Sequence, residues 1–492
     1  MEILLPVLGD LLTPSILIIC AIGAIIGVVL GAIPGLSGGL AIALLLPITF
    51  TMEPIVAIPL LMTIFVGSMS GSFIGAILLG IPGTPSSVAT VFDGYEITKK
   101  GNPVKALSAG VASSSIGIIP SLIIAMFLSP IIASFAVKLG PWEFFSLAVV
   151  AILMVVSLSK GNLSKGLLSA GIAIAITSVG TDPLSGVTQR FTFGNFYLSS
   201  GFSLIPVMLG LFAGSIILLE YAEGAKSSDS NKVKVSRFKW PGKALIKNIR
   251  NVIQSFFIGL WIGILPGLGG SLSNLMAYAT AKNTSKHPEK FGKGTIDGVI
   301  APETANNASL GGSLIPFISL GIPGDTVTAL LIGALTIQGV EAGPLIFTNS
   351  PDIVYMIFAA AIIGAILVVV FQIFAMPLFP MILRIPYHYL YPVIFVVCLT
   401  GAYLSSNNLF DVFVTLGFTL LGVFMAYMKL PVGPFILTFV LASLLETNLR
   451  KGVSYEGYFS FFTHPISLIF LIIAVVSTLY PIVKDHFKKV HQ

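Results

Sequence analysis

Long apolar runs recur along this chain, and they constrain its fold more than any other feature. One example is SILIICAIGAIIGVVLGAI, which begins at Ser15. A helix of this length crosses a hydrocarbon core of roughly 30 Å. Only 9% of the 492 residues are charged, whereas soluble domains carry roughly a quarter. The sequence therefore predicts an all-α polytopic membrane protein.

The net charge of +6 does not indicate a nucleic-acid partner. The basic residues stand at the ends of apolar segments, and no aromatic and basic face accompanies them. Cys20 and Cys398 lie inside apolar runs, which favours a packing role over a disulfide or a metal site. No cleavable signal peptide is visible, so we expect the first helix to be retained.

One basic segment divides the chain. Residues 225–250 contain eight basic residues and one acid. Because short basic loops stay in the cytoplasm, this segment is expected to be a cytoplasmic linker, and the basic tail is expected on the same side. The predicted organisation is a first repeat at 1–224, the linker at 225–250, and a second repeat at 251–492 that includes a C-terminal helix and the tail.

Two motifs occur in both halves, in the same order. GAIPGLSGG at 31–39 matches GILPGLGGS at 263–271 at five of nine positions. GSFIGAILLGIPGTP at 71–85 matches GSLIPFISLGIPGDT at 312–326 at nine of fifteen. The persistence of both order and register indicates an internal structural repeat.

The charges around the motifs reverse between the two copies. Acids precede the first motif, whereas the basic linker precedes its second copy. Residues 1–10 and 341–352 are therefore expected outside, and 99–105, 226–250 and 484–492 in the cytoplasm. This predicts about twelve membrane segments in two repeats of inverted topology, an architecture typical of secondary transporters. Arg450 and Lys451 fall on the outer side in this count, against the charge rule.

The Pro-Gly motifs are expected to interrupt helices inside the membrane. Residues 254–265 and 270–281 form two arms of twelve residues around Pro266-Gly267. Each arm would span about 18 Å as a helix, which is too short to cross the bilayer. The sequence thus predicts re-entrant hairpins or broken helices with Pro-Gly tips. A half-helix that starts at a tip directs unpaired N–H groups inward, which suits an anion.

Small and polar residues gather at these predicted helix starts, where they are expected to bind the substrate. A lone Pro-Gly pair is usually only a kink, but four pairs related by a repeat favour a binding role. The candidate substrate-binding residues are Gly35, Ser37, Gly38, Gly83, Thr84, Ser86, Ser87, Gly267, Gly269, Ser271, Ser273, Asn274, Asn306, Asn307, Gly324 and Thr326.

Three acids within apolar segments are candidates for ion coupling, because charged groups in a membrane are costly and usually functional. Asp325 stands at a predicted helix start, where it would either cap the helix or bind a coupling cation or proton. Glu303 lies beside two asparagines and would line the cavity. Asp93 would be either part of the site or a solvated helix end near Lys99.

The motifs resemble the large permease subunit of tripartite tricarboxylate transporters, the TctA family. The resemblance runs from residue 31 to 347 and includes GIPGTPSSVATVFDGYEITKKGNPVKAL and APETANNASLGG. It implies uptake of carboxylates such as citrate across a bacterial inner membrane. It also implies a small TctB-like membrane subunit and an extracytoplasmic TctC-like binding protein. Energy would come from a Na⁺ or H⁺ gradient, with no cofactor and no enzymatic activity.

Two other classes are alternatives. An anion channel would show selectivity rings and oligomeric symmetry, whereas the repeat here is internal. An intramembrane protease is suggested only by GLSG at 35–38, which resembles the rhomboid motif in four residues. A serine nucleophile needs a base within hydrogen-bond reach, and all five histidines stand at segment ends or in the tail.

Overall fold

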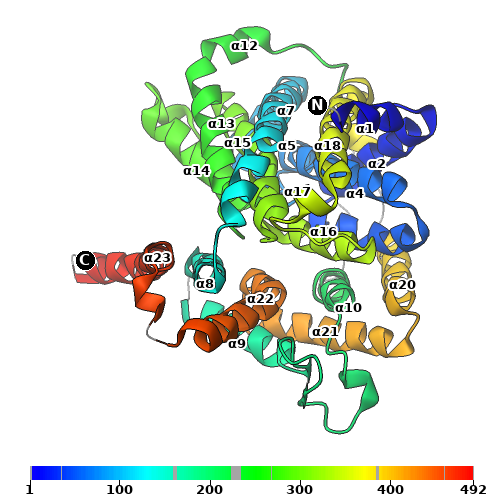
Figure 1. Cartoon of the computed structure of the whole chain (residues 1–492). Coiled ribbons are helices and arrows are strands. Elements are labelled where there is room, and N and C mark those ends of the chain that lie inside the picture. Colours follow the sequence, from blue (N-terminus) through cyan, green and yellow to red (C-terminus); the bar gives the residue numbers. More distant parts are fainter. Residues whose placement is uncertain are drawn as a thin grey trace. The chain divides into compact units, whose positions relative to one another are not determined.

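The computed structural model describes residues 3–34, 36–158, 163–222, 234–267, 269–383, 387–458 and 460–490. These residues are almost entirely helical (Figure 1). Within them, one two-stranded antiparallel ladder pairs β1 (Gly180–Thr181) with β2 (Gln189–Arg190), in the register Gly180 to Arg190. The predicted all-α class is confirmed.

The chain forms two compact units. One comprises residues 1–133 and 217–401, and the other comprises 134–216 and 402–492. Each unit therefore combines a segment from each predicted repeat. The repeat boundaries at 224 and 251 themselves remain a prediction.

The first unit contains the Pro-Gly motifs. Its elements before the basic linker are α1 (Leu4–Leu11), α2 (Pro14–Ala32), α3 (Gly38–Leu45), η1 (Leu46–Thr51), α4 (Pro54–Gly71), α5 (Phe73–Leu79), η2 (Pro85–Ser87), α6 (Val88–Lys99) and most of α7 (Pro103–Ala136). Those after it are α12 (Gly242–Lys247), α13 (Ile249–Ile264), α14 (Gly269–Thr284), η5 (Pro288–Lys290), α15 (Asp297–Leu320), α16 (Thr326–Ile337), α17 (Ile346–Asn349), α18 (Pro351–Ala375), η6 (Met376–Leu378), α19 (Phe379–Ile382) and most of α20 (Tyr387–Ser406).

The second unit is also helical and carries the strand pair. Its helices are α8 (Pro141–Leu158), α9 (Leu163–Thr177), η3 (Phe196–Leu198), α10 (Leu204–Met208), the π-helical turn η4 (Leu209–Gly214), the start of α11 (Ser215–Ala222), α21 (Leu409–Tyr427), α22 (Val432–Glu456), η7 (Ser460–Thr463) and α23 (Pro465–Val490).

Seven helices of the described chain are long and apolar enough to cross a membrane, by length and composition. They are Pro14–Ala32, Pro54–Leu79, Pro103–Ala136, Leu204–Ala222, Pro351–Ile382, Leu409–Tyr427 and Val432–Glu456. Shorter apolar helices flank the Pro-Gly breaks, such as Ile249–Ile264 and Thr326–Ile337. Together they give a multi-pass membrane protein.

The sequence repeat appears again in the packing. A Cβ on Gly31 would collide with the carbonyl oxygen of Ser68, so α2 and α4 approach backbone to backbone. The counterpart of Gly31, which is Gly263, meets Ser309 of α15 in the same way. Since Ser309 is the counterpart of Ser68, the pair α13 and α15 repeats the contact between α2 and α4. Small residues permit this close approach in membrane helices.

The helix breaks also match between the copies. α5 ends at Gly80 with φ 73°, and α15 ends at Gly321 with φ 69°. Both values lie in the left-handed region that glycine adopts without steric cost. A proline follows two residues later in each copy and prevents the helix from resuming at once.

The arms around Pro266 differ in length from the prediction. α13 and α14 each contain 16 residues, not twelve, and each is therefore about 24 Å long. The extra turn at each outer end carries polar or basic residues such as Arg250 and Lys282. The prediction counted only the apolar core of each arm, whereas the backbone stays helical beyond it.

α15 lies at the centre of the first unit. From Gly298 to Ser319 every residue of this helix is buried. It packs against α13, α14, α6 and α4. A helix buried on all sides must satisfy its polar side chains internally, and α15 carries Glu303, Asn306 and Asn307.

Candidate functional site

The helix starts that follow the Pro-Gly tips converge within the first unit. A Cβ on Gly38, at the start of α3, would lie 3.4 Å from Val327 in the first turn of α16. A Cβ on Gly39 would lie 3.8 Å from the Thr326 hydroxyl. The start of α3 in the first half therefore faces the start of α16 in the second half.

The other two starts meet in the corresponding way. A Cβ on Gly270, at the start of α14, would lie 2.9 Å from the Ser86 Cβ in η2. A Cβ on Gly269 would lie 2.9 Å from the Asp325 Cβ. Four helix starts thus gather in one region. Side chains cap one N–H group at three of these starts, those of Leu40, Ala89 and Thr328. The other N–H groups of the first turns carry partial positive charge, which makes such a region suited to a carboxylate.

Most hydroxyl groups at these starts already have protein partners. The Ser37 Oγ accepts a hydrogen bond from Leu40 N at 3.1 Å and caps α3. The Thr84 and Ser86 hydroxyls lie 2.7 Å apart. The remaining contacts are those of Ser87, which donates to the Thr84 carbonyl at 3.0 Å, and of Ser273, which donates to the Gly270 carbonyl at 3.0 Å.

Ser271 and Thr326 differ from these residues. Both are half-buried at the start of a half-helix. Neither hydroxyl forms a hydrogen bond with the described part of the chain. By contrast, the hydroxyl of Ser273, two residues after Ser271 in α14, is bonded. These two hydroxyls are therefore the ones available to a ligand.

Asp325 forms a capping box at the start of α16. Its Oδ1 accepts a hydrogen bond from Thr328 N at 2.8 Å, while its own N–H donates to the Thr328 hydroxyl at 2.9 Å. Of the two roles that the sequence allowed, this geometry favours the cap. The coupling role stays a prediction.

The glycines at the tips are tightly packed. A Cβ on Gly83 would collide with the Gly31 carbonyl oxygen, and one on Gly324 would lie 2.7 Å from the Ser313 Cα. Gly267 has φ 75°, and its N–H donates to the Gly324 carbonyl at 2.7 Å. Substitution of these glycines would therefore test packing rather than ligand contact. Gly35 lies outside the described residues.

A buried polar network joins α15 to its neighbours. Asn307 accepts from the Ser70 hydroxyl at 2.5 Å and donates to the Ser114 hydroxyl at 2.9 Å. Asn306 donates to the Met69 carbonyl at 3.4 Å. The Asn306 Oδ1 has no hydrogen-bond partner and lies 2.3 Å from the position that a Cβ on Gly270 would occupy. The network thus reaches the start of α14.

Glu303 lies in the same network. Its Oε1 accepts from the Thr90 hydroxyl at 2.5 Å, and Thr90 in turn accepts from Asn274 at 3.3 Å. The Glu303 side chain is fully buried, and its Oε2 has no hydrogen-bond partner. Among the described residues no cationic side chain forms an ion pair with it.

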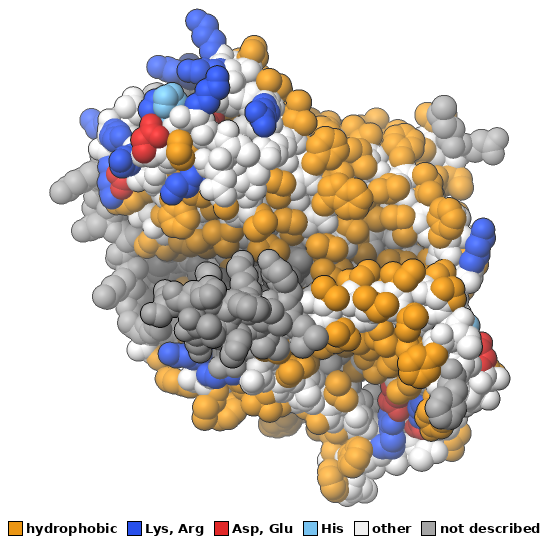
Figure 2. Space-filling model, turned by 90° about the vertical axis from the view of Figure 1, so that its left-hand side faces the viewer, with side chains coloured by type: hydrophobic (Ala, Val, Ile, Leu, Met, Phe, Trp, Pro, Cys, Tyr) orange, Lys and Arg blue, Asp and Glu red, His pale blue; other side chains and the backbone are white. Residues whose placement is uncertain are grey.

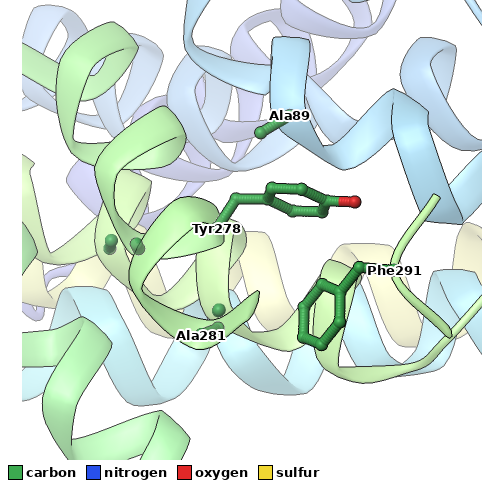
Figure 3. Packing of buried hydrophobic residues seen from close by; sticks show 7 residues of the cluster. Ala89, Tyr278, Ala281 and Phe291 are labelled. Carbon is green, nitrogen blue, oxygen red and sulfur yellow. The ribbon is translucent and has the colours of Figure 1, made fainter. Parts of the chain in front are cut away.

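Asp93 has a different environment. Its two oxygens accept from the Tyr278 hydroxyl at 2.8 Å and from three backbone N–H groups, those of Gly292, Gly294 and Thr295. The Tyr278 ring packs beside Phe291, with the ring centroids 5.5 Å apart (Figure 3). The carboxylate thus fastens the loop before α15, which favours a structural role. The predicted coupling role of Asp93 is not tested by these contacts.

Several polar partners were not among the predicted residues. Thr90, Ser70, Ser114 and Gln372 are buried, and each is bonded to another polar group of the network or to its backbone. Sequence offers one signal for Thr90, because it stands one helical turn before Asp93 on the same face. Ser70, Ser114 and Gln372 become visible only when distant helices are brought together.

The comparison with known families decides what kind of protein carries this region. The profile of the tripartite tricarboxylate transporter TctA family matches residues 17–437. This match covers both copies of the Pro-Gly motifs and the whole polar network.

The chain belongs to the TctA family. It is thus a membrane transport protein of tricarboxylate transport, and the predicted resemblance is confirmed. The TctA family is a transporter family, consistent with the expectation that the chain is not an enzyme.

Two relatives of this TctA protein come from Agrobacterium vitis. One, described as an uncharacterized 52.8 kDa protein in the TAR-I ttuC' 3'region, is 35% identical over 488 residues, which cover 97% of this chain and 96% of the relative. The other, described as an uncharacterized protein in the TAR-II ttuC' 3'region, is 37% identical over 232 residues, 46% of this chain and 96% of the relative. No solved structure matches the chain.

Proposed function

We propose that this TctA protein is the large membrane subunit of a binding-protein-dependent importer of tricarboxylates or other small carboxylates. The observation that carries the proposal is the convergence of the four helix starts at Gly38, Ser86, Gly269 and Thr326. These starts present N–H groups, and two free hydroxyls, to one buried region. A carboxylate needs such donors when it leaves water.

Membership of the TctA family supports the proposal that the chain works with two partner subunits. A tripartite system comprises this subunit, a small TctB-like membrane subunit and a TctC-like binding protein outside the cytoplasm. We place the complex in a bacterial inner membrane, with the C-terminus in the cytoplasm as the basic tail indicates.

Counterflow tests the transport function. The chain is reconstituted with its two partner subunits in proteoliposomes. The proteoliposomes are loaded with unlabelled citrate and exposed to a trace of labelled citrate. A carrier accumulates label transiently because exchange through an alternating site needs no gradient. Simple equilibration of the label would indicate a channel, and the absence of any citrate-dependent flux would exclude citrate as the substrate.

Transport is driven by an ion gradient in this proposal, with Glu303 as the group that couples to it. Glu303 is buried without a cationic partner. Three acceptor oxygens of the network lack a donor, namely Glu303 Oε2, Asn306 Oδ1 and Gln372 Oε1. A proton on the carboxyl group, or a bound cation, would supply the missing positive charge.

Substitution by the neutral amide separates coupling from exchange. Glu303→Gln keeps the size of the side chain and should preserve citrate counterflow while abolishing accumulation driven by a pH or sodium gradient. Asp93→Asn is the matched control, because Asp93 is equally buried but fully bonded; it should lower stability and leave coupling intact. Gradient-driven accumulation by Glu303→Gln at the parent level would assign coupling elsewhere.

A further inference from the structure

A large hollow lies on the basic surface of the first unit. It has a volume of about 860 Å³ and is lined by the loop before α7, by residues 234–236 and by the start of α12. The Lys239 N–H donates to the Ser108 hydroxyl at 3.1 Å, which fastens this part of the linker to α7. Figure 2 shows Lys and Arg side chains gathered at the upper left of the face that it views.

The charge of the hollow has one sign. Lys105, Lys234, Lys239 and Lys243 line it, and no acid is among the described lining residues. None of these four lysines forms an ion pair within the described chain. A second hollow of about 570 Å³ shares Lys105 with the first and adds Lys247, Arg250, Lys286 and Lys290, with one acid, Asp297.

An apolar row starts beside this basic region. Four of its side chains recur every four residues along α13, so they lie on one side of that helix, and the fifth stands near the end of α12 just before it. Each is more than half exposed in a chain that belongs in a membrane. The row consists of Ile246, Ile249, Ile253, Phe257 and Trp261.

Trp240 indicates how deep in the membrane the hollow lies. It lines the hollow and is 68% exposed. Tryptophan is enriched where the hydrocarbon core meets the headgroups. The basic hollow therefore lies at headgroup level, and the apolar row leads from it along a membrane helix.

We propose that this hollow binds the headgroup of an anionic phospholipid, whose acyl chain lies along the apolar row of α12 and α13. The lysines neutralise the phosphate, and their aliphatic stems line the cavity. A soluble anion would use the lysines but would have no need of the exposed row or of Trp240. The proposal is independent of the transported substrate.

Quenching of Trp240 fluorescence tests the proposal in the full chain. The variant Trp261→Phe serves as the parent, because Trp261 is exposed on the row and would also be quenched. Trp142 is buried, so the quenching reports on Trp240. The protein is placed in vesicles that contain acyl-brominated phosphatidylglycerol or acyl-brominated phosphatidylcholine. We expect brominated phosphatidylglycerol to reach half-maximal quenching at a mole fraction about tenfold lower than brominated phosphatidylcholine, since each nearby basic residue favours anionic lipid.

Charge variants identify the site. The preference for phosphatidylglycerol over phosphatidylcholine should be lost in the triple variant Lys105→Gln, Lys239→Gln, Lys243→Gln. The corresponding Lys→Arg triple variant should keep this preference. A control with the same loss of charge, Lys138→Gln, Lys429→Gln, Lys451→Gln, should also keep it.

Three results would overturn the proposal. Equal quenching by the two lipids would show a lipid contact without headgroup recognition. Displacement of the anionic lipid by millimolar phosphate or citrate would indicate a site for soluble anions. Quenching by neither lipid would show that another protein surface covers Trp240.

Discussion

At the scale of single residues, hydrogen bonding separates structural polar groups from those left for a ligand. Asp93 accepts four hydrogen bonds, whereas Glu303 has one bonded oxygen and one without a partner. An unsatisfied buried polar atom costs roughly 1–3 kcal/mol. Such atoms persist where function requires them, which is why the network around Glu303 is the stronger functional candidate.

The two free hydroxyls at the helix starts give the first prediction. Ser271→Ala and Thr326→Val each remove one donor to a bound carboxylate and break no bond within the described protein. A hydrogen bond to a charged group contributes roughly 1.5–3 kcal/mol. Substrate affinity, measured by calorimetry or by the KM of uptake, should therefore fall at least about tenfold.

Ser273→Ala is the matched control, because its buried hydroxyl donates to the Gly270 carbonyl within α14. It should alter stability slightly and leave affinity unchanged. Parent-like affinity in both the Ser271 and Thr326 variants would remove these helix starts from the binding site.

The capping box of Asp325 gives the second prediction. Asp325→Asn keeps an oxygen that can accept from Thr328 N, so folding and ion-stimulated uptake should stay close to those of the parent. Asp325→Ala loses the cap and should lower the free energy of unfolding by about 1 kcal/mol. Measurements of thermal unfolding and of ion-stimulated uptake in both variants distinguish the capping role from the coupling role. Loss of ion-stimulated uptake in a well-folded Asp325→Asn would instead make Asp325 a coupling residue.

Residue types at the site could be predicted, but their partners could not. Asn306 and Asn307 stand out because amides are costly in an apolar segment. The partners Ser70 and Ser114 look like ordinary small residues of membrane helices. Only the packing of α4 and α7 against α15 brings their hydroxyls to Asn307, and that packing depends on contacts between residues far apart in the sequence.

At the scale of helices, local chemistry predicted the breaks better than the lengths. Pro-Gly pairs located the ends of α2, α5, α13 and α15, because proline and left-handed glycine stop a helix wherever they occur. The arms of 16 residues were underestimated because polar residues at their outer ends remain helical.

The position of Arg450 on α22 also acquires a reason. Its guanidinium donates to both carboxylate oxygens of Asp182, at 2.8 and 2.7 Å, and lies 3.2 Å from Glu446. The hydrogen bond from Arg450 and backbone N–H groups lower the pKa of Asp182 to about 2. These ion pairs explain what holds Arg450 in place. The predicted outer location of Arg450 and Lys451 still runs against the charge rule, which counts basic residues and gives acids little weight.

A histidine that joins two elements of the second unit gives the third prediction. His464 lies 2.7 Å from Glu143 at the start of α8 and 2.7 Å from Glu456 at the end of α22. Its hydrogen bond with Glu143 and that with Glu456 raise the pKa of His464 above 6.5. The stabilisation is complete below that value, while the glutamates remain ionised, and it is lost as the pH rises through the raised pKa.

His464→Gln should therefore destabilise the protein more at pH 6 than at pH 9, by roughly 0.2–1 kcal/mol per partly exposed pair. Thermal unfolding of parent and variant in the same detergent across this range measures the difference. An equal effect of the substitution at both pH values would mean that the charge on His464 contributes nothing.

At the scale of the whole molecule, the internal repeat accounts for most of what is observed. Equivalent glycines, Gly31 and Gly263, make equivalent contacts, and each compact unit combines segments of both halves. Composition and repetition predicted the repeat itself, but not that each compact unit mixes segments of both halves. They could not predict which helix starts face each other across the halves, because that depends on how the two copies pack.

We propose that the two halves cross the membrane in opposite directions, so that their helix starts meet within it. Labelling of cysteines introduced at Lys100 and Glu341, which are both exposed, tests this topology. The natural Cys20 and Cys398 are buried, which keeps the background low. With a membrane-impermeant maleimide on intact cells, Glu341→Cys should react at once and Lys100→Cys only after permeabilisation. Equal labelling of both from outside would contradict the inverted repeat.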